Sequence, residues 1–258
     1  MGIRQFVSNL NALIFPGKQE TAQAAPSPSE QLWRENYDAR EAYFERAVGP
    51  LPPDILKMLH MAAVWPGGGL CVIPAPRLGP GMCLYTTFGL SNADMPTMYK
   101  MRDLSLQDEG GGGKRVSGTV EVREPAPRRP GFAGYGYEIC MLAAENQSWP
   151  VNFLQWAVNA EMNQDVGFLQ KVEQYQGLTI ESILVAPGMH IHVLIAKAQA
   201  PLPDGCALPA GRMEMLAACV ITEEEMRWSH QHGRDALLQK LQAAGLGYAS
   251  TPGRKSVL

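Results

Sequence analysis

The run Tyr-Gly-Tyr-Glu-Ile-Cys-Met-Leu-Ala-Ala at residues 135–144 decides the fold. A continuous apolar stretch of this kind, opened by glycine-containing turn residues, indicates a strand buried inside a sheet. Similar runs occur on both sides of it along the chain. They predict strands over residues 70–75, 82–90, 181–186, 190–198 and 212–221, with a shorter one at 116–122.

Helices are predicted around these strands by their start signals. Ser27, with Pro28 next and Glu30 three positions on, has the pattern of a capping box. Thr222 and Glu225 repeat that pattern near the other end of the chain. Four apolar residues then fall on one face of the first helix: Trp33, Tyr37, Phe44 and Val48.

Three further helices follow from the same reasoning. One opens at Pro52-Pro53-Asp54 and carries Ile55, Leu56, Leu59 and Ala63 on its apolar side. A second covers residues 148–164 with Ser148 as its cap, and Phe153, Leu154, Ala157 and Val158 point inward. The last carries Leu237, Leu238 and Leu241 and ends at Gly245.

The order of these elements indicates the fold class. The strands are grouped and the helices flank them without a regular βαβ rhythm, which favours an α+β fold with a mixed, largely antiparallel sheet. Residues 1–28 are expected to form an arm and linker, and residues 29–248 a single domain. Within it, residues 91–133 are expected to be a long loop or insertion. Residues 249–258 should form a C-terminal tail that is loose from Thr251 onward.

Composition excludes several classes of protein. The net charge is −3, whereas a nonspecific nucleic-acid-binding domain is expected to be basic. Five cysteines without a Cys-x-x-Cys motif indicate buried free thiols in a reducing compartment. The N-terminal segment lacks the unbroken apolar core of a signal peptide, and no window is apolar enough to cross a membrane. We therefore expect a cytoplasmic protein with neither a nucleic-acid nor a membrane partner.

No motif in the sequence carries recognisable chemistry. The glycine run 110–113 is followed by Lys114-Arg115 and lacks the Ser or Thr of a phosphate-binding loop. His190 and His192 share a strand face and could bind a metal with His230 or His232, but two histidines on a half-exposed sheet face are the simpler interpretation. Glu138, inside an apolar strand, is interpreted as a structural carboxylate. We expect no catalytic residue, metal or cofactor.

Charge is unevenly distributed along the chain. Residues 134–225 hold three basic and eleven acidic residues, a net charge of −8. Such a segment should favour encounter with a basic partner. Glu161 and Asp165 are one helical turn apart and should share a face. The candidate partner-binding residues are Glu161, Asp165, Glu173, Glu223 and Glu224.

Four stretches, taken in order, resemble the Suppressor-of-fused-like domain. They are LYTTFGLSN (84–92), GFAGYGYEICMLAAE (131–145), WPVNFLQWAVN (149–159) and AACVITEEEM (217–226). The resemblance runs from about residue 50 to residue 248, and residues 1–48 and 91–133 depart from it. It implies an α+β fold with sheet layers wrapped by helices and no established catalytic residues.

The resemblance also implies a function. Single-domain bacterial relatives are commonly encoded as immunity proteins beside polymorphic or type VI secreted toxins, which are often nucleases. We therefore expect a non-enzymatic immunity protein that neutralises a cognate toxin with a basic nuclease domain. Two alternatives stay open: an adaptor or chaperone-like protein that docks an effector through the apolar residues of the arm 1–28, and a metalloenzyme built on His190 and His192.

Overall fold

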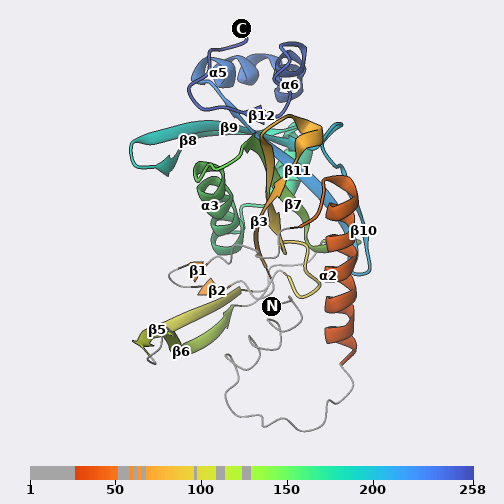
Figure 1. Ribbon diagram of the computed structural model, residues 1–258, viewed down its shortest axis with the longest axis vertical. Helices are drawn as coiled ribbons and strands as arrows, with labels where there is room; N and C mark the ends of the chain where they lie inside the picture. Colours follow the sequence, from red (N-terminus) through yellow and green to blue (C-terminus); the bar gives the residue numbers. More distant parts are fainter. Residues whose placement is uncertain are drawn as a thin grey trace.

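The computed structural model describes residues 27–51, 59–60, 63–64, 68–95, 98–108, 114–123 and 129–258 (Figure 1). Its centre is a mixed sheet with the strand order β3-β4-β7-β11-β9-β8. These strands are β3 Gly69–Pro74, β4 Met82–Phe88, β7 Phe132–Ala144, β11 Gly211–Ile221, β9 Met189–Lys197 and β8 Leu178–Ala186. The six strands of the main sheet agree with the six long runs predicted from the sequence.

Two short strands complete this sheet. β10 (Gly205–Leu208) pairs with β11, and β12 (Ala249–Ser250) pairs with β7. β7 runs parallel to β11 and to β12, and the remaining pairs are antiparallel. The expected α+β fold with a mixed, largely antiparallel sheet is therefore confirmed.

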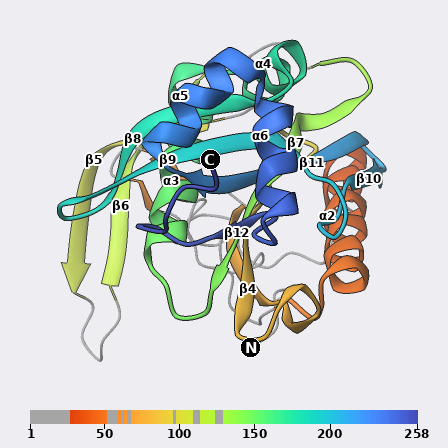
Figure 2. The same cartoon turned by 90° about the horizontal axis from the view of Figure 1, so that it is seen from above.

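Both faces of the sheet are buried along its central strands, which explains why these strands are apolar almost without interruption. On β11, Leu216, Ala218 and Val220 belong to one core, while Ala217 and Cys219 between them belong to the other. The first core is covered by α3 (Trp149–Gln164) and α4 (Phe168–Tyr175). The second is covered by α2 (Pro28–Ala47), α5 (Glu223–His232) and α6 (Arg234–Ala243), as Figures 1 and 2 show.

The predicted helix starts are mostly confirmed. Ser27 and Glu30 form a reciprocal capping box at α2, and Thr222 and Glu225 form another at α5. Ser148 is different, because its side chain makes no capping hydrogen bond although α3 begins at the next residue. Helix α4 was not anticipated from the sequence. The short 3-10 helix η1 (Pro76–Leu78) connects β3 to β4.

The interpretation of residues 91–133 as a long loop is wrong. They contain β5 (Met98–Asp108) and β6 (Lys114–Arg123), which pair antiparallel, and β6 includes the short strand predicted at residues 116–122. With β1 (Leu59–His60) and β2 (Ala63–Val64) they form a second sheet of order β1-β2-β5-β6. The helix predicted from Pro52 is therefore also wrong at its Leu59 and Ala63 positions, where the backbone is extended, while its start lies outside the described residues.

The part of the C-terminal tail that was expected to be loose, from Thr251 onward, is held in place. It follows β12, which pairs with β7 of the main sheet. Beyond it, the Arg254 guanidinium binds both carboxylate oxygens of Glu225 at 2.6 Å, and the Val257 amide donates to the same carboxylate. The tail is fixed because a buried carboxylate on α5 requires that cation. The predicted arm, apart from its last two residues, lies outside the described residues.

Candidate functional site

Glu161 does not belong to an acidic surface, contrary to the prediction from its spacing. Its carboxylate is buried at the junction of α3 and α4, where it accepts hydrogen bonds from the Gly167 and Phe168 amides and from the Tyr137 hydroxyl. Burial raises the pKa of Glu161, although these three bonds partly offset that effect. The residue stabilises a turn between two helices and is closed to a partner.

Asp165 is exposed, but it does not share an exposed face with Glu161. It ends α3 in a left-handed conformation with φ of 49°. The backbone therefore leaves the helix at this residue, which the helical spacing of the two acids could not reveal. Of the predicted pair, only Asp165 remains accessible to a partner.

Glu173, on α4, lies in a network of alternating charges. Arg129 and Lys197 both bind its carboxylate, and Lys197 continues to Glu214, which also binds Arg212. Two opposing effects act on the pKa of Glu173. Burial raises it, but the bonds to the two cations together lower it by more, so the net shift is downward. Because three cations surround two carboxylates here, this patch is not acidic.

The acidic start of α5 is divided between the surface and the interior. Glu223 and Glu224 are exposed, and Glu223 pairs with Arg227 one helical turn along. Glu225 is fully buried, and its bonds to Arg254, Thr222 and Val257 outweigh the effect of burial and lower its pKa. Of this cluster, Glu224 alone is exposed with no ion pair among the described residues.

The segment 134–225 is therefore less acidic in space than along the chain. Four of its carboxylates are neutralised by arginines that lie outside it in the sequence. The pairs are Glu138 with Arg40, Glu173 with Arg129, Glu223 with Arg227, and Glu225 with Arg254. A count along the chain assigns the negative charge to the segment and omits the cations that fold onto it.

The outer face of α2 carries an acidic row that sequence analysis missed. Asp38 and Glu45 are exposed and Glu41 is half-buried, and the three make no ion pair among the described residues. Partial burial and the nearby Glu45 and Asp38 charges raise the pKa of Glu41. The signal was the helical spacing of these acids within the predicted first helix.

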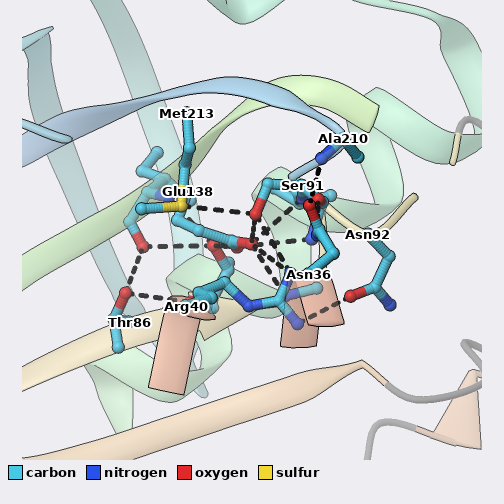
Figure 3. A network of polar contacts seen from close by, with 12 residues as sticks. Asn36, Arg40, Thr86, Ser91, Asn92, Glu138, Ala210 and Met213 are labelled. Atoms are coloured by element: carbon cyan, nitrogen blue, oxygen red, sulfur yellow. Dashed lines mark hydrogen bonds and ion pairs between the residues drawn. The ribbon is translucent and has the colours of Figure 1, made fainter. Parts of the chain in front are cut away.

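Glu138, on β7, is the centre of a buried polar network (Figure 3). Its Oε1 accepts from the Gly89 amide at 2.8 Å and the Ser91 hydroxyl at 2.6 Å, and its Oε2 accepts from the Thr87 hydroxyl at 2.7 Å. The Arg40 guanidinium of α2 lies 3.5 Å away and supplies the opposite charge. The expectation that Glu138 is buried, paired and hydrogen-bonded is confirmed.

Arg40 is buried completely and has its own partners. Its Nη1 donates to the Ser91 hydroxyl and its Nη2 to Asn92 Oδ1 at 2.6 Å, while the guanidinium lies over the Phe88 ring, 4.2 Å from the centroid. Burial lowers the pKa of Arg40, and Glu138 counteracts that effect. α2 is thus attached to the sheet by a charge pair in addition to its apolar side chains.

A glycine in the same region allows the turn after β4 to approach β7. Gly134 has φ of +58°, and a Cβ built on it would lie 2.4 Å from the Leu90 carbonyl oxygen. The next amide, that of Tyr135, donates to that carbonyl at 2.9 Å. The stretches 84–92 and 131–145, which carry the resemblance, therefore meet in space around Glu138 and perform a structural role.

The histidines do not form a metal centre among the described residues. His190 and His192 contact Ser182, and His230 contacts Thr179. No group of three potential ligands comes together in the part of the chain that the structure describes. The five cysteines are free thiols, and burial raises the pKa of Cys71, Cys140 and Cys219 to about 12. At neutral pH these three are protonated and poor nucleophiles.

The described residues also contain no helix long and apolar enough to pass through a membrane. The class of protein defined by the fold is an α+β domain with a two-sided mixed sheet and helices on both faces. The chain belongs to the Suppressor of fused (SUFU) family, whose model, described as Suppressor of fused protein, matches residues 54–255.

Solved structures share this fold. A chain from the crystal structure of the Sufu–Fu complex is 17% identical with a TM-score of 0.53, covering 86% of this chain and 92% of that one. Drosophila Suppressor of Fused is 15% identical with a TM-score of 0.50, covering 87% of this chain and 50% of that one. No curated protein gives a significant match. The family match begins after α2, yet Arg40 of α2 neutralises the buried Glu138.

Proposed function

We propose that this protein is non-enzymatic and acts by binding another protein directly. The observation that carries the proposal is membership of the Suppressor of fused family, together with a structure of the same fold that was solved as the Sufu–Fu complex. The buried carboxylates agree with this interpretation. Glu138, Glu161 and Glu225 are each held by donors of the protein itself and serve the fold.

The partner that we propose is a toxin with a basic nuclease domain, which this protein would neutralise as an immunity protein in the cytoplasm. The resemblance to bacterial single-domain relatives supports the toxin, and the exposed acids support its basic surface. They are Asp38 and Glu45 of the α2 row, with the half-buried Glu41 between them, together with Glu145, Asp165, Glu181, Asp204 and Glu224. A nuclease surface that binds phosphates presents cations that these carboxylates would attract.

Coexpression with the toxin encoded by the neighbouring gene tests this function. Cells that produce the toxin should survive only when this protein is present, and the two purified proteins should form a complex. Equal cell death with and without this protein would exclude the immunity function. Formation of a complex without protection would instead favour the adaptor function.

A charge variant separates the electrostatic argument from the rest. The triple variant Asp38→Asn, Glu41→Gln, Glu45→Gln removes like charges from one helix face and should leave the fold intact, because such charges repel. We expect slower association with the toxin and a weaker dependence on salt. The control is Asp235→Asn, an exposed acid of α6 that is not among the acids named above. If the triple variant binds as fast as the control, binding does not use the α2 row.

A further inference from the structure

The β8–β9 hairpin contains an irregularity that the proposed function does not use. Ile180 pairs with Val193 and Ile183 with Ile191, so two residues of β8, Glu181 and Ser182, lie opposite the single residue His192. This is a β-bulge. Ser182 has φ of +53°, a conformation that is unfavourable for a serine and that persists only where its surroundings hold it.

Two histidines hold Ser182 in this conformation. The Ser182 amide donates to His192 Nδ1 at 3.3 Å. On the other side, His190 Nδ1 lies 3.1 Å from the Ser182 hydroxyl and 3.3 Å from the Ser182 carbonyl oxygen. The two contacts differ in kind. His192 Nδ1 must be an unprotonated acceptor, whereas His190 Nδ1 can donate to the carbonyl in either charge state.

The imidazoles are accessible to solvent protons. Ile191 and Val193 belong to the core beneath α3, so the alternation of the strand places His190 and His192 on the opposite face. His190 is exposed and His192 is partly exposed. The end of the hairpin extends beyond the helices in both views (Figures 1 and 2). On the covered face, Asn152 of α3 donates to the Val185 carbonyl and anchors the strand.

Other titratable groups surround this face. Glu181 lies in the bulge itself. From α5, His230 contacts the Thr179 hydroxyl at 2.9 Å, and Glu223 and Glu224 follow shortly after Ile221, the register partner of His192. Arg227 pairs with Glu223. Carboxylates close to an imidazole favour its protonated form and do not oppose its formation.

We infer that the bulge at Ser182 is a pH-responsive element. Its hydrogen bond from the Ser182 amide to His192 Nδ1 forms when His192 is neutral and breaks when His192 is protonated. Protonation places an N–H on Nδ1, which removes the acceptor of the Ser182 amide and sets two donors against each other. The left-handed conformation of Ser182 then loses the bond that holds it. The β8 segment around Ser182 opens, while the core below it stays in place through Ile183, Val185 and Asn152.

Amide hydrogen exchange of the full-length protein tests this inference. Exchange at Ser182 is measured by NMR between pH 8 and pH 5 and divided by the intrinsic rate at each pH. Protection should fall about fivefold to tenfold, the size expected when one hydrogen bond is lost. The fall should follow the protonation of His192, read from its ring-proton shifts. The Leu194 amide, in the regular ladder of β9 and β11, serves as internal reference and should keep its protection.

Three variants assign the effect to one imidazole. His192→Asn keeps an acceptor that does not titrate, so Ser182 should stay protected at both ends of the range. His192→Phe removes the acceptor and should abolish protection at every pH, while unchanged Leu194 protection shows that the fold persists. His190→Asn should retain the pH step. A wild type without a step, or a His192→Asn variant with the wild-type step, would overturn the inference.

Discussion

Replacing Arg40 with Met should destabilise the protein strongly. The substitution keeps a long, unbranched side chain with a similar helix propensity, but it leaves the Glu138 carboxylate buried without its cation. It also removes the hydrogen bonds to Ser91 and Asn92. Removing one partner of a buried ion pair costs about 3–5 kcal/mol. In a domain of this size, that loss lowers the melting temperature by roughly 6–20 °C.

Urea denaturation followed by circular dichroism measures this loss against a matched control. Arg34 lies on the same helix but is exposed, so Arg34→Met should change the free energy of unfolding by less than about 0.5 kcal/mol. Both variants change helix propensity and net charge in the same way, so the difference between their free energies of unfolding reports the effect of burial and ion pairing at Arg40. If Arg40→Met costs no more than Arg34→Met, the buried pair does not help to attach α2, and its apolar side chains alone hold it on the sheet.

Two further substitutions address other contacts of the fold. Arg254→Met should destabilise the protein most at neutral pH and less as the pH falls. The lowered pKa of Glu225 gives a stabilisation that is present above the usual carboxyl pKa of 4.5 and is lost on acidification. Urea midpoints of the variant and the wild type from pH 7 to pH 3 measure this, and a difference that does not change with pH would contradict it. Gly134→Ala should lower the free energy of unfolding by more than the roughly 1–2 kcal/mol expected from a left-handed alanine, because its Cβ would clash with the Leu90 carbonyl oxygen. Gly188→Ala is the control, because Gly188 also has a positive φ but has open space around it, so that its loss of stability comes from the backbone alone.

The sequence predicted best those elements whose signals are local. The capping boxes at Ser27 and Thr222 located two helix starts, because a helix needs partners for its first amides wherever it lies in the fold. The apolar runs located the six long strands of the main sheet, and most clearly β4, β7 and β11, which are buried on both faces. Such strands cannot alternate with polar residues, so they are easy to recognise.

The missed elements depend on partners distant in the sequence. β5 lacks a continuous apolar run, and the glycine-rich stretch between β5 and β6 suggested a loop, so that only β6 was predicted, as a strand over residues 116–122. The apolar spacing after Pro52 suits a helix, yet residues 63–64 pair with residues 99–100 of β5. The tail beyond β12 lacks a local signal altogether. It is ordered because Arg254 reaches a carboxylate 29 positions earlier in the chain.

Three of the five candidate binding residues differ from expectation for the same reason: Glu161 is buried, and Glu173 and Glu223 are paired with cations. The net charge of a sequence segment predicts the charge of a surface only if its charged side chains face solvent and form no ion pairs with residues outside the segment. Here Arg40 and Arg254 each cross the fold to a buried carboxylate, and Arg129 covers Glu173. An acidic surface is better predicted on a helix whose buried face is already assigned. The apolar face of α2 was recognised from the sequence, so its opposite face, with Asp38 and Glu45, could have been found by the same periodicity.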